Sequence, residues 1–365
     1  MPELIEAAAD VIRSGRYING ENLRKFEKNM EDYFHVPFCI GVSTGLDALR
    51  LILTAYKELG LLHEGDEVIV PANTFIATFL AVTHCGLKAV AADVDESNFC
   101  LDFKRLPISP ATKAIIPVHL YGRVCWDEAV MRSLHDRGIL VIEDAAQSVG
   151  ARNPYPGFNG SEMAGALGDA AAISFYPAKN IGALGDAGAV LTADPQLAAA
   201  VRQLANYGSD VKYHHSLCGF NCRMDEMQAA LLNVKLPLAE EVALQRRRRA
   251  RLYSERITNP EVILPQMPAC EESHVWHQFV IRHPKRDLLR RFLEEEGIGT
   301  EIHYPVACHR QPCYEGHPLL LTPAPLPVAE RLASEVLSLP IADATDGQID
   351  FISNAINKFL HGNRH

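Results

Sequence analysis

The sequence has no apolar run long enough to cross a bilayer. Its longest apolar stretches, such as residues 75–85 (FIATFLAVTHC), are far shorter than the ~20 residues that a membrane-spanning helix needs. Residues 1–17 have no basic segment followed by an apolar one, so they do not resemble a secretory signal. These absences predict a cytoplasmic protein with no membrane partner.

An excess of positive charge and a disulfide framework are also missing. The 35 Lys and Arg against 45 Asp and Glu give a net charge of −10, which argues against a general nucleic-acid binder. The nine cysteines are scattered, odd in number and without a C-x-x-C spacing. We therefore expect neither a set of disulfides nor a metal site.

The chain is long enough, at 365 residues with 48% hydrophobic content, for two domains. Its first part alternates between short apolar segments and amphipathic ones, which predicts a mostly parallel sheet wrapped by helices. Strands are predicted at 39–42, 67–71, 88–94, 113–119, 139–144, 169–175 and 188–193, and helices at 21–34, 45–56, 75–86, 125–137 and 195–206. In such sheets ligands gather at the carboxyl ends of the strands.

The composition changes around residues 235–260, where an arginine run (246–249) lies in a predicted long connecting helix. In an acidic chain this run is better explained as a solvated helix face than as a phosphate or nucleic-acid patch. Beyond it the patterns predict strands at 274–283 and 299–305, a helix at 285–296, and two last helices lined by Val328, Leu332 and Val336 and by Ile349, Ile352, Ile356 and Phe359. We expect a large domain over residues 1–240 and a smaller α/β domain over residues 241–365.

The first candidate for chemistry is Asp144, at the end of the strand predicted over 139–144. A buried carboxylate there needs a cationic partner, and a protonated pyridine nitrogen would supply one and let the ring act as an electron sink. Capping of the following helix explains the same position equally well. Glu143 is expected to point to the opposite face of the sheet.

The second candidate is Lys179, in the turn after the strand at 169–175. A lysine in a turn is usually only solvated. One that is held on a rigid scaffold with a lowered pKa can instead form an imine with an aldehyde cofactor. The glycines that follow lack the G-x-G-x-x-G spacing, so a dinucleotide site is not expected.

The third candidate is the turn Ser43-Thr44-Gly45, directly before the helix at 45–56. The free N–H groups at a helix N-terminus bind phosphate. Plain N-capping by the Ser or Thr hydroxyl accounts for the same residues. Singly, the three features leave function open.

Taken in order, six segments resemble the DegT/DnrJ/EryC1/StrS sugar aminotransferases. The segments are VSTGLDAL (42–49), PANTFIAT (71–78), IEDAAQSVGA (142–151), SFYPAKNIGALGDAG (174–188), GFNCRMDEMQAA (219–230) and GTEIHYP (299–305). The resemblance covers essentially the whole chain. It implies the type I fold of pyridoxal 5′-phosphate (PLP) aminotransferases, an α/β fold with a mostly parallel large-domain sheet and a smaller C-terminal α/β domain.

The same resemblance implies roles for matching residues. Lys179 would form the imine with PLP and act as acid and base. Asp144 would pair with the pyridine nitrogen, Gln147 would approach the O3′ side of the ring, and Phe75 would stack on it. The cofactor phosphate would be held by Ser174 and the turn Thr44, Gly45 and Leu46, and by Asn221 of the neighbouring subunit in a homodimer with shared sites.

The substrate side is implied in the same way. His303 matches a family histidine near the sugar nucleotide, and Tyr176, Lys212 and His309 are further candidates. The reaction would move an amino group from L-glutamate, which becomes 2-oxoglutarate, to a nucleotide-linked keto sugar, with pyridoxamine 5′-phosphate as the intermediate cofactor form.

Leu46 and the segment 206–215 (NYGSDVKYHH) most resemble the branch that acts at C-3 of dTDP-3-keto-6-deoxyhexoses. The alternatives are a transaminase acting at C-4 of a UDP-, GDP- or dTDP-linked 4-keto-6-deoxy sugar and a non-catalytic regulatory homologue. A dehydratase of the same family, in which histidine replaces the lysine, is disfavoured because Lys179 is present. Another type I enzyme acting on an amino acid is disfavoured by the HYP and GFNCR segments.

Overall fold

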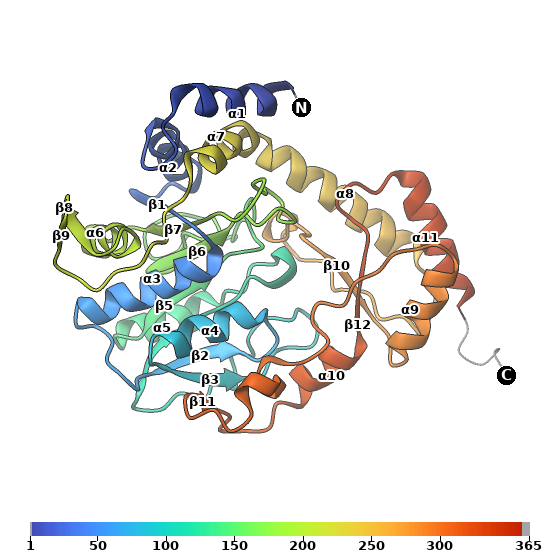
Figure 1. Cartoon of the computed structure of the whole chain (residues 1–365). Coiled ribbons are helices and arrows are strands. Elements are labelled where there is room, and N and C mark those ends of the chain that lie inside the picture. Colours follow the sequence, from blue (N-terminus) through green and yellow to red (C-terminus); the bar gives the residue numbers. More distant parts are fainter. Residues whose placement is uncertain (1, 360–365) are drawn as a thin grey trace.

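The structure, a computed structural model, describes residues 2–359 and is organised around an eight-stranded sheet (Figure 1). The strand order is β1-β7-β6-β5-β4-β2-β3-β11. β7 runs antiparallel to its neighbours β1 and β6, and the other neighbouring strands of this sheet are parallel. The bounds are β1 Phe38–Val42, β2 Glu67–Pro71, β3 Lys88–Ala92, β4 Thr112–Ile115, β5 Leu140–Asp144, β6 Ala170–Ser174, β7 Gly188–Thr192 and β11 Leu320–Leu321.

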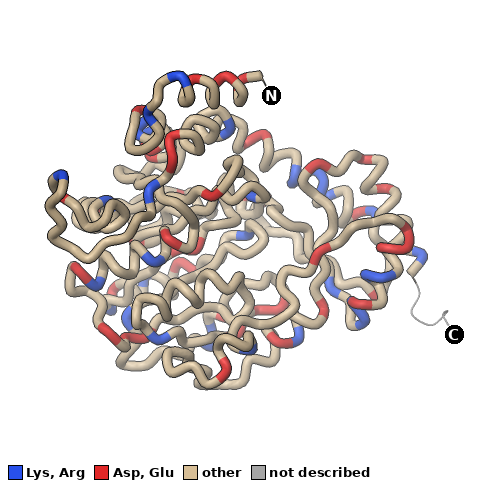
Figure 2. Tube along the Cα trace, in the orientation of Figure 1, with Lys and Arg blue, Asp and Glu red and all other residues tan. Residues whose placement is uncertain are grey.

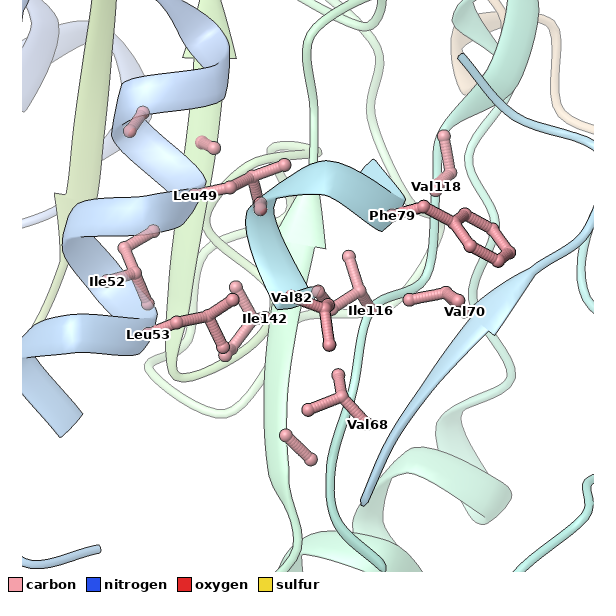
Figure 3. Close-up of a cluster of buried hydrophobic side chains, with 14 of the residues drawn as sticks. Leu49, Ile52, Leu53, Val68, Val70, Phe79, Val82, Ile116, Val118 and Ile142 are labelled. Atoms are coloured by element: carbon pink, nitrogen blue, oxygen red, sulfur yellow. The ribbon is translucent and has the colours of Figure 1, made fainter. Parts of the chain in front are cut away.

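Both faces of this sheet are covered, which explains why its strands are apolar at consecutive positions. Val68 and Val70 of β2 pack on the side of α3 (Gly45–Glu58) and α4 (Ile76–His84), whereas Ile69 packs with residues of α5 (Glu128–Asp136). Figure 3 shows the first of these layers, in which the side chains of α3 and α4 meet those of the strands. The mostly parallel α/β sheet expected from the sequence is confirmed.

Three helices from the two ends of residues 1–240, the predicted large domain, pack together. Both α1 (Pro2–Ser14) and α2 (Glu21–Phe34) contact α7 (Glu226–Lys235), beside which they lie in Figure 1. Also in this part of the chain, α6 (Pro195–Ala205) is followed by a short hairpin of β8 (Ser209–Val211) and β9 (His214–His215).

The long helix α8 (Ala239–Arg256) was expected, but the solvated face predicted for its arginines is wrong for two of them. Arg246 and Arg247 are buried and donate to backbone carbonyl oxygens of the segment 274–277. That segment is irregular, so its carbonyl groups lack a strand partner. The several N–H groups of a guanidinium can satisfy them at once.

The C-terminal elements differ from the sequence patterns in three places. The predicted strand 274–283 is reduced to β10 (Phe279–Arg282), which pairs antiparallel with β12 (Val336–Leu339). Val336 therefore begins a strand and does not extend the preceding helix, α10 (Pro327–Glu335). The strand expected at 299–305 is wrong, because only Glu301 bridges Ser338 and Pro305 has no N–H to donate. The remaining helices are α9 Arg286–Glu295 and α11 Asp346–Lys358.

The chain after residue 240 contributes to two cores. Side chains from 250 to 359 form a separate buried cluster, centred on β10, β12, α9 and α11. Strand β11, however, pairs with β3 in the large sheet, and Tyr314 and Leu332 pack in the core of that sheet. The boundary at residue 240 stays a prediction.

Acidic and basic residues are interspersed on the outer elements (Figure 2). Two ion pairs, Arg248–Asp346 and Arg256–Asp350, join α8 to α11 in this way. None of the helices within residues 2–359 is long and apolar enough to cross a membrane.

Candidate active site

The candidate site lies at the edge of the sheet where β1, β2, β5 and β6 end, called here the carboxyl edge. Because these four strands point the same way, their last residues meet at one edge. Thr44 follows β1, Phe75 follows β2, Asp144 ends β5 and Ser174 ends β6. The topology thus explains why residues far apart in sequence gather here.

Asp144 is buried and its carboxylate is bonded by neutral groups. Oδ2 accepts a hydrogen bond from the Thr78 hydroxyl at 2.8 Å, and Oδ1 accepts one from the Ala146 N–H at 3.2 Å. Its neighbour Glu143 points to the other side of β5, where it accepts N–H groups of residues 165–168 and pairs with His119. Among residues 2–359, no Lys, Arg or His forms an ion pair with Asp144. A cationic ligand group would complete its environment.

Lys179 lies in the turn after β6, and its amine is largely removed from water. This burial lowers the pKa of Lys179 to about 8, against the opposing attraction of the Asp144 carboxylate. At pH 7 roughly one amine in ten is therefore uncharged, far more than for an ordinary lysine, and the uncharged form is the one that attacks an aldehyde.

The N-terminus of α3 can bind an anion through the backbone N–H groups of Gly45 and Leu46, a feature called here the cradle. The N–H groups of Gly45 and Leu46 are the first two of the helix, so they have no carbonyl partner within it. The Thr44 hydroxyl caps the helix through the Asp47 N–H and also donates to the Asp47 carboxylate, which the neighbouring Ser43 hydroxyl contacts as well. The capping interpretation therefore holds for Thr44, whereas Ser43 only donates to the Asp47 carboxylate. Neither hydroxyl occupies the N–H groups of Gly45 and Leu46, which remain for a ligand.

Small residues keep this cradle close to β6 and β7. A Cβ on Gly45 would lie 2.8 Å from the Cβ of Ser174, and one on Gly188 would lie 2.5 Å from the Thr44 carbonyl group. The Ser174 hydroxyl is thereby held beside the two free N–H groups. Together they offer three donors for a phosphate.

Gln147 and Phe75 are connected through Tyr304. The Gln147 Nε2 donates to the Tyr304 hydroxyl at 3.2 Å, and its Oε1 accepts the Tyr121 N–H at 2.6 Å. The ring of Tyr304 lies against that of Phe75, with centroids 5.4 Å apart. Phe75 itself is about half exposed (53%), so one side of its ring is available to a ligand.

Two histidines lie close enough to Lys179 for its positive charge to lower their pKa values. Burial and the nearby Lys179 lower the pKa of His303, whose Nδ1 is 2.8 Å from the Ser338 hydroxyl. Burial, then Lys179, holds the pKa of His277 well below its usual range. The Asn180 amide nitrogen donates to a backbone carbonyl, so its Oδ1 accepts the proton on the His277 Nδ1, at 3.1 Å. His277 is therefore a neutral imidazole at the edge of the site.

The other residues named from the sequence are placed differently. Tyr176 is exposed beside Lys179, whose N–H bonds to the Tyr176 carbonyl oxygen. Lys212 is on the exposed β8–β9 hairpin, with its amine 5.1 Å from the Tyr213 ring. His309 is buried and turned to Glu330, at 2.9 Å. Asn221 is exposed and bridges Asn206 through the backbone. Their roles toward a ligand stay predictions.

Sequence reasoning missed four residues that the structure brings to the site. Thr78 holds Asp144, and Tyr121, Tyr304 and His277 surround Gln147 and Lys179. Thr78 and Tyr304 lie inside the segments PANTFIAT and GTEIHYP, so those segments carried a signal for them. Tyr121 and His277 are brought in only by the tertiary fold.

The donor set fits PLP. An amine with a lowered pKa suits the aldehyde, a buried carboxylate without a bonded cation suits the pyridinium, and the N–H cradle with Ser174 suits the phosphate. Within residues 2–359, no three His, Cys, Asp or Glu side chains form a group that could hold a metal ion.

Comparison with characterised proteins gives relatives over most of the chain. It is 44% identical to the erythromycin biosynthesis sensory transduction protein EryC1 of Saccharopolyspora erythraea, over 93% of this chain and 90% of the relative. It is 41% identical to dTDP-3-amino-3,6-dideoxy-alpha-D-galactopyranose transaminase of Aneurinibacillus thermoaerophilus (98% and 95%). It is 39% identical to a UDP-N-acetyl-3-dehydro-alpha-D-glucosamine 3-aminotransferase of Acidithiobacillus ferrooxidans (99% and 94%).

Solved structures agree with these relatives. The crystal structure of S. venezuelae DesV in complex with a ketimine intermediate superposes with a TM-score of 0.89, at 41% identity, over 98% of this chain and 94% of that one. The type I aminotransferase fold expected from the sequence is thereby confirmed. Residues 1–357 match a single family description, and the chain belongs to the DegT/DnrJ/EryC1/StrS aminotransferase family.

Proposed function

We propose that the protein is a PLP-dependent aminotransferase that moves an amino group from L-glutamate to a nucleotide-linked keto sugar. The observation that carries this proposal is the environment of Lys179. Its amine, with a pKa of about 8, shares a site with the buried Asp144 carboxylate and the N–H cradle of α3. Family membership supports the same activity.

The position of each residue in the site indicates its role in the reaction. Bound PLP would supply an aldehyde carbon for the amino group and a ring that withdraws electrons. Asp144, held by Thr78, would present its charge to the ring nitrogen, and Ser174 with the Gly45 and Leu46 N–H groups would hold the phosphate. Lys179 Nζ takes and returns the proton that must move during transfer. Such positioned proton transfer contributes ~10²–10⁴-fold to the rate.

For the sugar, we propose transfer at C-3 of a dTDP-3-keto-6-deoxyhexose. The relative from A. thermoaerophilus, named for a dTDP-3-amino-3,6-dideoxy sugar, supports this substrate, as does the Leu46 form of the cradle. The relative from A. ferrooxidans, named for a UDP-linked 3-dehydro sugar, makes a UDP-3-keto sugar the second candidate. Both names place the chemistry at C-3.

The name of the S. erythraea relative describes sensory transduction, which keeps a regulatory role as the competing hypothesis. Such a role would leave the catalytic groups without a purpose. Here Lys179, Asp144 and Gln147 are all present and mutually arranged at the carboxyl edge. That arrangement favours an enzyme.

The test is a substrate screen with a matched variant. Purified protein is loaded with PLP and given L-glutamate with dTDP-, UDP- and GDP-linked 3-keto or 4-keto sugars, and products are identified by mass spectrometry. We expect an amino sugar from the dTDP-3-keto substrate. Lys179→Met, which keeps an unbranched side chain and removes the amine, should form no amino sugar and should lose the visible absorbance that borohydride abolishes. An unchanged rate in Lys179→Met would refute the lysine's role, and no product from any keto sugar would refute the substrate class.

A further inference from the structure

A closed ring of hydrogen bonds lies beside the candidate site. The Tyr121 N–H donates to the Gln147 Oε1 at 2.6 Å, and the Gln147 Nε2 donates to the Tyr304 hydroxyl at 3.2 Å. Tyr304 is joined by its peptide bond to His303, and the Tyr121 hydroxyl donates to the His303 carbonyl oxygen. Tyr121 thus closes the ring from both of its ends, one through the backbone and one through the side chain.

Tyr121 is held rigidly where it closes this ring. It is buried, and its ring packs edge-on against Phe99 with centroids 5.2 Å apart. Its φ of +59° is one that aromatic residues rarely adopt, so the surrounding structure must enforce it. Its carbonyl oxygen also accepts the Gln278 N–H, at 3.4 Å.

Gly122 explains how three segments can converge at this point. A Cβ on Gly122 would lie 2.7 Å from a Val275 methyl group, 3.0 Å from the Gln147 carbonyl oxygen and 3.0 Å from the His277 nitrogen. With φ of +91°, the position also favours glycine on conformational grounds. The backbone at 121–122 is therefore packed between the β5 loop and the segment 275–278.

The ring fixes the direction of two groups that face the site. Because the Gln147 Oε1 accepts a proton from Tyr121, its Nε2 must be the end that reaches Tyr304. On the other side, the His303 backbone is held by Tyr121 while its Nδ1 bonds to Ser338, which leaves Nε2 as the end of the imidazole away from that contact. Tyr121 thus orients both the side-chain amide of Gln147 and the imidazole of His303.

We propose that Tyr121 is a positioning residue for the sugar substrate. It sets the place of His303 and Tyr304 relative to Gln147, and so the geometry of the groups that would bind the sugar nucleotide. This inference rests on the proposed function and on the family resemblance, which implies that Gln147 faces the cofactor and His303 the sugar nucleotide. Tyr121 itself touches neither.

The test uses Tyr121→Phe, which removes only the hydroxyl and leaves the N–H bond to Gln147. In the holoenzyme we expect KM for the keto sugar nucleotide to rise about fivefold, the effect of one lost hydrogen bond. The maximal rate, the half-reaction with glutamate and the affinity for PLP should stay within twofold. Amide hydrogen exchange over residues 301–307 should become faster, as measured by mass spectrometry.

The matched control is Tyr253→Phe. The Tyr253 hydroxyl also donates to a backbone carbonyl oxygen, that of Pro340 at 2.7 Å, and its ring is equally buried, but it lies in the core of α8 and β10. This variant should change neither KM nor the exchange of 301–307. Equal KM values in wild type and Tyr121→Phe, or equal changes in both variants, would overturn the proposal.

The outcome also separates this inference from the proposed function. If wild-type protein aminates no keto sugar nucleotide, the proposed function fails, but faster exchange of 301–307 in Tyr121→Phe alone would still support the positioning of that segment by Tyr121. If wild-type protein is active and neither KM nor exchange responds to Tyr121→Phe, the positioning role fails while the function holds.

Discussion

Lys179 carries an amine whose charged form is disfavoured by its surroundings. Burial lowers its pKa from 10.5 to about 8, and the Asp144 carboxylate only partly offsets this. The folded apo-protein then binds fewer protons than the unfolded chain between these two pH values, so the lysine's cost to stability is complete below pH 8 and disappears as the pH rises to 10.5.

A lysine that destabilises the fold can be replaced with a gain in stability. At pH 7 we expect apo-Lys179→Met to be more stable than the wild-type apo-protein by about 1–2 kcal/mol, a value reduced for the partial exposure of the side chain. The difference should shrink toward zero between pH 8 and pH 10.5.

Urea unfolding at equal protein concentration, at pH 7 and pH 10, measures this difference. Lys25→Met, which replaces an exposed lysine on α2, is the control and should not show it. A Lys179→Met variant that is no more stable than wild type at pH 7 would contradict the lowered pKa.

At the scale of single residues, the sequence was informative where one residue type has few roles in a given place. Asp144 at the end of an apolar strand and Lys179 in the next turn were expected near one edge of the sheet, where the structure has them, because buried strands deliver their last residues to a shared edge. Their roles toward a cofactor stay predictions. Tyr121 and His277 were not found, because their importance comes from contacts between segments far apart in the sequence, which no local pattern reveals.

At the scale of elements, the predicted strands agree with the observed ones where the segment is buried. The strand predicted at 67–71 is β2, and the one at 139–144 is β5 to within a residue, since both are buried on two faces and flanked by turns. The prediction failed at 299–305, where an alternating pattern has almost no strand partner. It failed again at Arg246 and Arg247, whose burial depends on a segment 30 residues away. Local pattern indicates an element's type, but its partner decides whether the element forms.

The start of α2 depends on another helix. Its N-cap residue, Gly20, has no side chain to cap the helix. The buried carboxylate of Glu226, on α7, instead accepts the N–H groups of Gly20, Asn22 and Leu23 at 2.8–2.9 Å. A negative charge at this end of a helix is favourable for the helix dipole as well.

Glu226→Gln should therefore uncouple α2 from α7. The amide turns one acceptor into a donor that opposes a backbone N–H, so we expect a loss of about 2 kcal/mol in the free energy of unfolding. Glu21→Gln, which changes an exposed carboxylate in the first turn of the same helix, should cost far less. The two variants are compared by their urea midpoints. Equal midpoints would show that Glu226 does not cap α2.

At the scale of the whole molecule, segments that carry the candidate site also carry exposed aromatic and apolar side chains. Phe75, Tyr176 and Leu184 are each more than half exposed, and all lie in segments that carry the candidate site. Asn221, expected to reach the cofactor phosphate of a partner, is exposed as well. A second copy of the chain covering these segments would bury these side chains and complete the site.

The competing arrangement is that Asn221 serves its own chain. Its neighbour Cys222 accepts the Ser43 N–H, so Asn221 lies near the cradle of the same subunit. The two arrangements differ in which chain supplies each residue to one site. Mixing of two inactive variants distinguishes them.

Lys179→Met and Asn221→Asp subunits, each inactive alone because one lacks the amine and the other repels the phosphate, would be unfolded together and refolded as random dimers. If Asn221 acts across the interface, every mixed dimer has one site with Lys179 from one chain and Asn221 from the other. Half of the dimers then carry one intact site of two, and activity should return to about a quarter of wild type. Lys179→Met mixed with Asp144→Asn is the control, because both residues belong to one chain's site and no intact site can form. No recovery in the first mixture would argue for a site built within a single chain. Recovery in the control would show that activity returns without Asn221 crossing the interface, and would contradict the placement of Lys179 and Asp144 in one chain's site.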